Sequence, residues 1–241
     1  METIKFVDNF NSVYKNKKIL ITGHTGFKGS WLTIWLTKLG AKVIGYSLEE
    51  YENDYIFDHA KLSNKIMADE RGNIKDFNKV NAIFEKYQPE FVFHLAAQPL
   101  VRQSYKSPLD TYQTNVLGTI NILECIRLCP SVKNAVIITT DKVYKNKEKK
   151  EPYKETDELG GFDPYSTSKA CAELAISSYK NAFYSHQGKK IASVRGGNVI
   201  GGGDWSKNRL FPDCVKYLQK KEPIPIRNPS AIRPWQHGLD L

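Results

Sequence analysis

The sequence contains few cysteines and no cluster of residues with the spacing of a metal site. Its 241 residues include four cysteines, at positions 125, 129, 171 and 214. Cys125 and Cys129 lie four apart in a stretch of helical periodicity, and no second close pair or neighbouring histidine completes a metal-ligand set. We therefore expect buried free thiols and no bound metal.

Long apolar runs are also missing. No segment reaches the roughly 20 consecutive apolar residues that a membrane-spanning helix needs. Residues 1–18 are polar and of mixed charge, without the apolar centre of a secretory signal. These absences predict a cytoplasmic protein with no membrane partner.

The sequence lacks a continuous basic surface, although 35 Lys and Arg against 26 Asp and Glu give a net charge of +9. The densest basic patch, residues 145–150, is interrupted by Glu148 and followed by Glu151 and Glu155. Elsewhere the lysines are scattered, and no basic stripe is interleaved with aromatic residues. This distribution argues against a nucleic-acid partner and supports at most a preference for an anionic small molecule.

The sequence does contain apolar runs of strand length that alternate with segments of helical period. Strands are expected at 18–22, 43–46, 65–68 (weak), 91–95, 135–140 and 191–195, and helices at 29–39, 76–87, 110–128 and 164–184. Continuous apolar strands separated by helices indicate a parallel sheet covered on both faces. The predicted fold class is therefore α/β, with a doubly wound parallel sheet.

The composition of the sequence changes after residue 195, where the alternation of strand and helix patterns ends. Three consecutive glycines (201–203) and five prolines between 212 and 234 indicate irregular chain around one short helix at 211–220. We therefore predict one large domain, residues 1–195, and a small, incomplete lobe, residues 196–241.

A glycine-rich loop joins the first expected strand to the first expected helix. It has the spacing G-x-x-G-x-x-G, with glycines at Gly23, Gly26 and Gly29. Glycines permit the tight turn and let backbone amides approach a pyrophosphate at the helix N-terminus. A tight turn without a ligand is the alternative, but the place of this loop after the first strand of a βαβ series favours dinucleotide binding.

The end of the second strand bears on which dinucleotide is bound. Proteins that bind NAD usually carry an acidic residue there, which holds the ribose hydroxyls. Here the chain reads Tyr46-Ser47-Leu48, with Glu49 and Glu50 slightly later, and no arginine is present to hold a 2′-phosphate. NAD is therefore favoured over NADP.

Tyr165 and Lys169 form a candidate acid–base pair. Asp163 and Pro164 are suited to the N-cap and first turn of a helix, so Tyr165 and Lys169, four apart, share a helix face. A lysine cation beside a phenol lowers the phenol pKa from about 10. The pair could then take the proton of a hydroxyl during hydride transfer, although the spacing alone also fits a pair on a surface helix.

Together these motifs resemble the extended short-chain dehydrogenase/reductase family. Further matching segments are His94–Gln98, Asn115 and Thr139–Tyr144. Within that family, the chain resembles the nucleotide-sugar 4,6-dehydratases, above all those acting on CDP-glucose. The phrases that carry this resemblance are GHTGFKGSWL (23–32), AAQPLVRQSY (96–105), RGGNVIGGGDW (195–205) and IRNPSAIRPWQH (226–237).

The resemblance implies a Rossmann domain over residues 1–195 that binds NAD, and a partial substrate-binding lobe over residues 196–241. It also implies a reaction without net redox change. Tyr165, with Lys169 and Thr140, would remove the 4-hydroxyl proton while C4 gives its hydride to NAD. Water would then leave across C5 and C6, and the hydride would return to C6. Asp141 is the expected acid for the leaving hydroxyl and Lys142 the expected base at C5.

Lys142 must be neutral to act as a base, and we expect burial beside Lys169 to depress its pKa. Because successive strand residues face opposite sides, Asp141 and Lys142 can line one pocket only if the strand ends near Thr140. A charged loop after the strand is the alternative reading of this pair.

The resemblance also implies the binding residues. For the dinucleotide they are Gly23, His24, Thr25, Gly26, Phe27, Lys28, Gly29, Asn73, Ile74, Leu95, Ala96, Ala97, Gln98, Tyr165 and Lys169. For the nucleotide sugar they are Gln98, Arg102, Asn198, Arg209, Arg227 and Arg233, because arginine binds phosphate in a bidentate way. The family also implies a homodimer or dimer of dimers, and a role in deoxysugar and O-antigen polysaccharide synthesis.

Two departures from the family pattern leave alternatives open. Gly72-Asn73-Ile74 stands where Gly-Asp-Ile is usual, and the chain ends at Leu241, soon after the last family phrase. A C4 epimerase or reductase of the same fold is one alternative, although the Asp141–Lys142 pair argues against it. A shortened NAD-binding remnant without turnover is the other.

Overall fold

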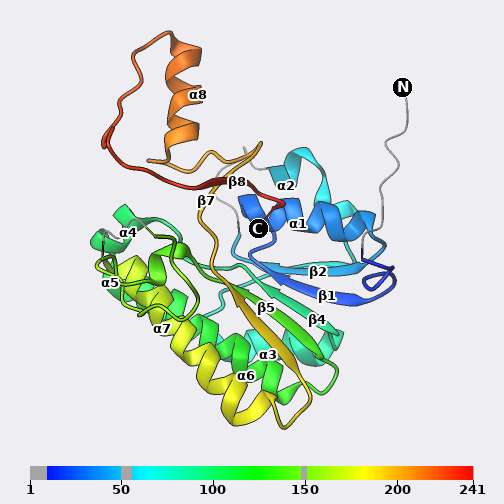
Figure 1. Ribbon diagram of the computed structural model, residues 1–241. Coiled ribbons are helices and arrows are strands. Elements are labelled where there is room, and N and C mark those ends of the chain that lie inside the picture. The colour runs from blue at the N-terminus through cyan, green and yellow to red at the C-terminus, as the bar shows by residue number, and fades with distance from the viewer. Residues whose placement is uncertain (1–9, 50–55, 148–150, 241) are drawn as a thin grey trace.

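The computed structural model describes residues 10–49, 56–147 and 151–240, so Glu50 and residues 148–150 lie outside the described part. Its centre is a parallel sheet of six strands in the order β3-β2-β1-β4-β5-β6 (Figure 1). The strands are β1 (Lys18–Thr22), β2 (Lys42–Ser47), β3 (Ala68–Arg71), β4 (Phe91–His94), β5 (Asn134–Ile138) and β6 (Lys190–Val194). This order confirms the predicted doubly wound α/β fold.

Helices cover both faces of the sheet. In the view of Figure 1, α1 (Phe27–Lys38) and α2 (Ile56–His59) lie above the sheet. Three helices lie below it: α3 (Phe77–Tyr87), α6 (Gly118–Leu128) and α7 (Pro164–Tyr179). The larger apolar cluster joins these three helices to the sheet, and a smaller one joins β1 and β2 to α1. Because both faces are covered, Ile19, Leu20 and Ile21 in the central strand are almost completely buried.

The third strand lies three residues later than the apolar pattern predicts. Ile66 and Met67 favour a strand over 65–68, but β3 begins at Ala68 and pairs with β2 through Arg71. Its charged residues are tolerated because β3 is an edge strand with partners on both faces. Glu70 faces Lys86 and Tyr87, whereas Asp69 and Arg71 pair with each other.

The two long helices predicted after β4 and β5 are interrupted by π-helical turns. The first consists of α5 (Pro108–Tyr112), the π turn Gln113–Leu117 and α6. The second consists of α7 and the π turn Lys180–Tyr184. As expected, Asp163 caps α7 by accepting a hydrogen bond from the Ser166 amide, and Pro164 is in the first turn.

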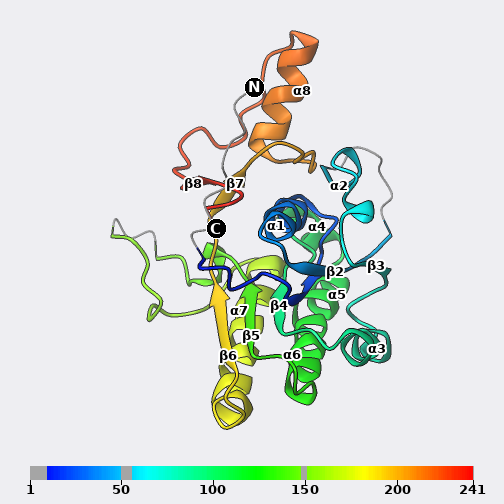
Figure 2. The ribbon, with the colours of Figure 1, turned by 90° about the vertical axis from the view of Figure 1, so that its right-hand side faces the viewer.

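Beyond β6 the chain leaves the sheet. It forms β7 (Asn198–Ile200), α8 (Leu210–Lys220) and β8 (Trp235–His237), and β7 and β8 make a short parallel pair. Figure 2 shows α8 projecting away from the six-stranded sheet. The sequence predicts α8 but neither short strand, because the pairing joins segments far apart in the chain, such as Asn198 with Trp235. The division into domains at residue 195 stays a prediction.

The chain also forms three short helical elements. They are α4 (Val101–Lys106), which the sequence did not predict, and the 3-10 turns η1 (Leu62–Asn64) and η3 (Asp141–Val143). None of the described helices combines the length and apolarity needed to cross a membrane.

Candidate active site

The turn between β1 and α1 requires its glycines. Gly23 has a φ of +73°, in the left-handed region, and a Cβ there would lie 2.8 Å from the backbone nitrogen of Ala96. A Cβ on Gly29 would overlap the carbonyl oxygen of Gly23. Backbone segments thus meet so closely that side chains are excluded, which leaves the N-terminus of α1 open to a ligand.

A groove of about 590 Å³ runs along this turn, and we call it the loop groove. Its size lies within the range of small-molecule sites. Of the residues predicted for the dinucleotide, it is lined by Gly23, Thr25, Gly26, Phe27, Lys28, Gly29, Asn73, Ile74, Leu95, Ala96 and Ala97. The ends of β2 and β3 contribute Ser47, Leu48, Glu49 and Gly72.

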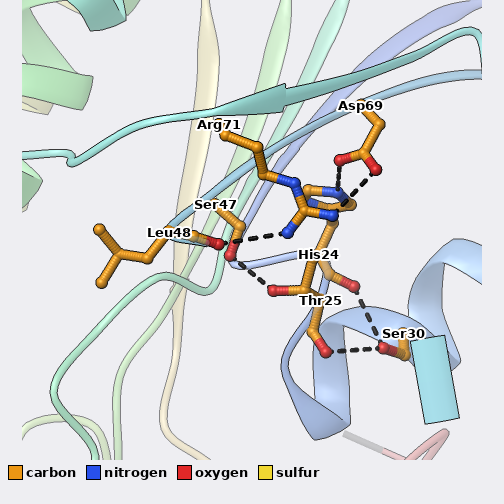
Figure 3. Close-up of polar contacts among 7 residues, drawn as sticks. All are labelled: His24, Thr25, Ser30, Ser47, Leu48, Asp69 and Arg71. Carbon is orange, nitrogen blue, oxygen red and sulfur yellow. Dashed lines mark hydrogen bonds and ion pairs between the residues drawn. The ribbon is translucent and has the colours of Figure 1, made fainter. Parts of the chain in front are cut away.

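His24 does not line the loop groove but lies beneath it. Its Nε2 is 2.9 Å from Asp69 Oδ1, and Asp69 also accepts a hydrogen bond from Arg71 (Figure 3). Arg71 in turn donates to the carbonyl of Leu48. Burial lowers the pKa of His24, although the hydrogen bond and charge of Asp69 act in the opposite direction. The cluster ties the glycine-rich loop to the ends of β2 and β3.

Three hydrogen bonds of hydroxyl groups also hold the same loop. Thr25 Oγ1 lies 2.7 Å from Ser47 Oγ, which joins the loop to the position where an acidic residue is usual (Figure 3). Ser30 donates to the carbonyls of His24 and Thr25. Ser47 is therefore engaged with the loop, while Glu49, two residues later, lines the groove.

The predicted catalytic residues gather where β5 ends. The strand stops at Ile138, and Thr140 caps the 3-10 turn Asp141–Val143 by accepting from the Lys142 amide. Because the extended chain ends before Asp141, the alternation of a strand does not separate Asp141 from Lys142. The strand therefore ends early enough for the pair, but of the two residues only Lys142 lines the large cavity described below.

Tyr165 is buried in the first turn of α7, beside this turn. Burial raises the pKa of its phenol, and a hydrogen bond with Thr140 acts in the opposite direction. The predicted lowering of the phenol pKa is therefore wrong for the protein alone, because desolvation of the phenolate outweighs the favourable contacts.

Lys169 lies one helical turn after Tyr165 and is 5% exposed. Its ammonium donates to the carbonyl of Ile138 over 3.1 Å, at the last residue of β5. Burial lowers its pKa to about 7, and the positive charge of Lys28 adds to this shift. Lys169 lines neither the loop groove nor the larger cavity described below.

The predicted burial of Lys142 is wrong. Its side chain is one-third exposed, and its ammonium lies 3.1 Å from Asp141 Oδ1. Thr140 also donates to that carboxylate oxygen. The carboxylate of Asp141 is likewise about one-third exposed, so the two charges form a half-buried ion pair.

Behind this turn lies a buried polar network that the sequence did not reveal. Glu173, one turn after Lys169, accepts hydrogen bonds from Thr139 at 2.5 Å and Ser193 at 2.9 Å. It also pairs with Arg195 at 3.1 Å. Burial alone would raise the pKa of Glu173, but these hydrogen bonds and the Arg195 charge lower it. The network joins β6, α7 and the end of β5.

A second network holds the segment after β4. Asn115 exchanges hydrogen bonds with the backbone of Gln98 and donates to Ser168 on α7. The amide of Gln98 contacts Leu100 and Thr111, so Gln98 lines neither cavity, although it is predicted to bind both ligands. Contacts of this kind join segments far apart in the chain, so no local sequence pattern predicts them.

A larger cavity of about 920 Å³, which we call the large cavity, adjoins the loop groove. The catalytic candidates Thr140, Lys142 and Tyr165 line it. So do most of the residues predicted for the nucleotide sugar, namely Arg102, Asn198, Arg209, Arg227 and Arg233. The wall that the large cavity shares with the loop groove is made of Lys28, Pro99, Leu100, Gly203, Asp204, Trp205, Lys207 and Arg209.

The arginines of the large cavity come from three segments. Arg102 belongs to α4, Arg209 precedes α8, and Arg227 and Arg233 follow it. Two of them have carboxylate partners, since Arg209 pairs with Asp204 and Arg227 with Asp213. The cavity thus combines fixed guanidinium groups with the candidate catalytic side chains, which suits a ligand that carries phosphate.

Comparison with known proteins agrees with this arrangement. The family model described as GDP-mannose 4,6 dehydratase matches residues 20–241. The CDP-glucose 4,6-dehydratase of Salmonella typhimurium is 48% identical over 94% of this chain, which spans 64% of the length of that enzyme.

Solved structures share the fold. The UDP-glucose 4-epimerase of Thermotoga maritima, with UDP-glucose, has a TM-score of 0.80 and 26% identity over 92% of this chain and 70% of its own. The dTDP-glucose 4,6-dehydratase of Bacillus anthracis, in complex with NAD, has a TM-score of 0.78 at 23% identity over 93% and 68%. The parallel sheet, the glycine-rich turn and the match over residues 20–241 together place this chain in the GDP-mannose 4,6-dehydratase family.

Proposed function

We propose that the protein catalyses the NAD-dependent conversion of CDP-glucose to CDP-4-keto-6-deoxyglucose. The observation that carries this proposal is the position of Tyr165, which lines the large cavity beside Thr140 and Lys142, while that cavity adjoins the loop groove. A sugar held in the large cavity would then meet a dinucleotide held in the loop groove. The Salmonella relative, 48% identical, supports CDP-glucose as the substrate.

The loop groove fits the dinucleotide. Gly23 and Gly29 leave no room for a side chain beside the N-terminus of α1, which suits the close approach of a pyrophosphate. The residues of the loop groove would hold NAD, which would supply an acceptor for the C4 hydride and a donor for its return to C6. Ser47 with Glu49 lies where the ribose hydroxyls are expected, and Asn73 and Ile74 lie where the adenine is expected.

Tyr165 is the proposed base for the 4-hydroxyl proton. Its phenol must ionise to act, and burial opposes that ionisation in the protein alone. The hydrogen bond with Thr140 stabilises the phenolate, and the positive charge of bound NAD would add to this effect. We therefore propose that Tyr165 becomes an effective base only in the complex.

Asp141 and Lys142 are proposed to carry out the loss of water. Lys142 would take the C5 proton, and Asp141 would protonate the departing 6-hydroxyl. For these roles the lysine must be neutral and the carboxyl protonated. Transfer of one proton across their 3.1 Å contact produces both states at once. In this proposal the ion pair is the resting form of the acid–base pair.

The proposal is tested by incubating the protein with CDP-glucose and NAD and following the products by NMR and mass spectrometry. We expect a 4-keto-6-deoxy nucleotide sugar, lighter than the substrate by one water, without accumulation of NADH. A C4 epimer without mass change would instead indicate an epimerase. Net formation of NADH would indicate a dehydrogenase or reductase, and cofactor binding without turnover would indicate a remnant. Parallel reactions with dTDP-glucose and GDP-mannose test the choice of nucleotide.

We further infer a homodimer that forms through the helices opposite α1. Leu109 on α5, Leu117 in the following π turn and Leu174 on α7 are more than half exposed, and α5 and α7 are in contact. Sedimentation of the protein and of a Leu117→Glu variant tests this inference, since only the variant should sediment as a monomer.

We also place the enzyme in the cytoplasm, in deoxysugar synthesis for an O-antigen or similar surface polysaccharide. The four free cysteines suit a reducing compartment. Fractionation of the cells in which it is expressed tests the compartment.

A further inference from the structure

Lys28 occupies a position that is unfavourable for a cation. It is the second residue of α1, where the helix dipole is positive, and the first turn of α1 contains no acidic residue. Its side chain is partly buried. Burial, first, and the charges of Arg209 and Lys142 lower its pKa to about 8. The surrounding protein therefore destabilises the charge of Lys28 rather than stabilising it.

The carboxylates near Lys28 are already paired with other cations. Asp204 forms an ion pair with Arg209 and Asp141 with Lys142. Lys28 itself forms no hydrogen bond or ion pair with any residue in the described ranges. An unpaired ammonium kept at such a place points to an interaction with a ligand.

The position of Lys28 indicates which part of a ligand it meets. Lys28 belongs to the wall shared by the loop groove and the large cavity. The charges of Arg209 and Lys142 act on Lys28, and the charge of Lys28 acts on Lys169, one helical turn after Tyr165. Under the proposed function, hydride transfer requires the nicotinamide ring to contact the sugar at the junction of the two cavities, which is where Lys28 lies.

We propose that the Lys28 ammonium biases the bound dinucleotide toward its reduced form. This inference rests on the proposed function. The oxidised nicotinamide ring is a cation and the reduced ring is neutral, so a nearby ammonium repels only the oxidised form. Lys28 would therefore favour removal of the hydride from C4, at the cost of weaker binding of NAD than of NADH.

The charge of Lys28 makes this bias dependent on pH. With a pKa of about 8, the lysine is mostly charged at pH 7 and mostly neutral at pH 9. The charged groups that act on it or share its wall are Arg209, Lys142, Lys169 and Lys207, with Asp204 and Asp141. Lys169 also has a lowered pKa, so the effect of Lys28 must be isolated by comparing variants at each pH.

The test measures the dissociation constants of NAD and of NADH for the full-length protein, by isothermal titration calorimetry at pH 7 and pH 9. We expect the ratio of the two constants, NAD over NADH, to be about tenfold larger in the unaltered protein than in Lys28→Met at pH 7. Tenfold corresponds to about 30 mV for a two-electron couple. The difference should shrink at pH 9.

Two further variants make the test specific. Lys28→Arg keeps its charge at pH 9, so it should keep the preference for NADH there. Lys79→Met removes an exposed cation of α3 that lines neither cavity, and it should leave the ratio unchanged. If Lys28→Met fails to fold, Lys28→Arg still tests the pH dependence.

Two results would overturn the inference. The first is an unchanged ratio of the two constants in Lys28→Met. The second is equal weakening of both dinucleotides, which would make Lys28 a ligand of the phosphates that NAD and NADH share. If neither dinucleotide binds even to the unaltered protein, the proposed function fails as well, which distinguishes the two failures.

Discussion

Replacing Glu173 with glutamine is expected to destabilise the whole protein. The carboxylate is 5% exposed at its side chain and forms an ion pair with Arg195, whose side chain is 16% exposed. Glutamine keeps the shape and one acceptor oxygen, which can still bind Thr139 or Ser193. It removes the negative charge, however, and leaves the guanidinium without its carboxylate.

The size of the effect follows from burial. Removing one partner of a buried ion pair costs about 3–5 kcal/mol, because the other charge stays desolvated. Arg195 retains the carbonyl of Glu155 as an acceptor and lies over the Tyr144 ring, so the lower end of that range applies. We expect a loss of about 3 kcal/mol, which for a protein of this size lowers Tm by roughly 6–12 °C.

The pH dependence has a definite sign. The pKa of Glu173 is lower in the folded protein than its ordinary value of 4.5. A carboxyl with a lowered folded pKa contributes stability that is present above the unfolded pKa and is lost as pH falls through the folded pKa. The difference between the unaltered protein and Glu173→Gln should therefore be full at pH 7 and should shrink below about pH 4.5.

Urea unfolding followed by circular dichroism at pH 7 and at pH 4 measures both effects. Glu158→Gln is the matched control, because Glu158 is half exposed and its ion-pair partners among the described residues are the surface lysines Lys145 and Lys147. That variant should unfold like the unaltered protein. If Glu173→Gln were equally stable at pH 7, or if its loss were the same at both pH values, the reasoning would be refuted.

Three further predictions concern the site. Gly29→Ala should weaken NAD binding at least about tenfold, because its Cβ overlaps the Gly23 carbonyl; titration of NAD with unchanged affinity would contradict this. Tyr165→Phe should fold normally but lower kcat by at least about 100-fold; near-normal turnover would exclude Tyr165 as the base. Lys142→Met should stop exchange of the C5 proton with deuterated solvent, measured by NMR, whereas normal exchange would show that another group is the base.

Much of the fold could be predicted from local sequence. The strands at 18–22, 91–95 and 191–195 and the helices beginning near Asp76 and Asp163 were found because burial on both faces gives continuous apolar runs and because caps have local signatures. The glycine-rich loop could be predicted for a similar reason, because its glycines are required by the backbone conformation of the loop itself.

The charged strand Ala68–Arg71 was misplaced because its stability depends on partners from elsewhere. Asp69 contacts His24, and Glu70 contacts Lys86 and Tyr87, so charges that look unsuited to a strand are paired once the sheet forms. An edge strand in such surroundings needs no apolar run.

The sequence by itself determined the parallel α/β fold, the glycine-rich loop and which residues are candidates for catalysis beside Tyr165. Only the tertiary structure decided their electrostatic states. It exposed Lys142 beside Asp141, joined Glu173 to Arg195, and left Lys28 without a described counter-ion at the wall between two cavities. The physical reason is that a charge responds to burial and to neighbours at a few ångströms, and those neighbours come from segments far apart in the chain.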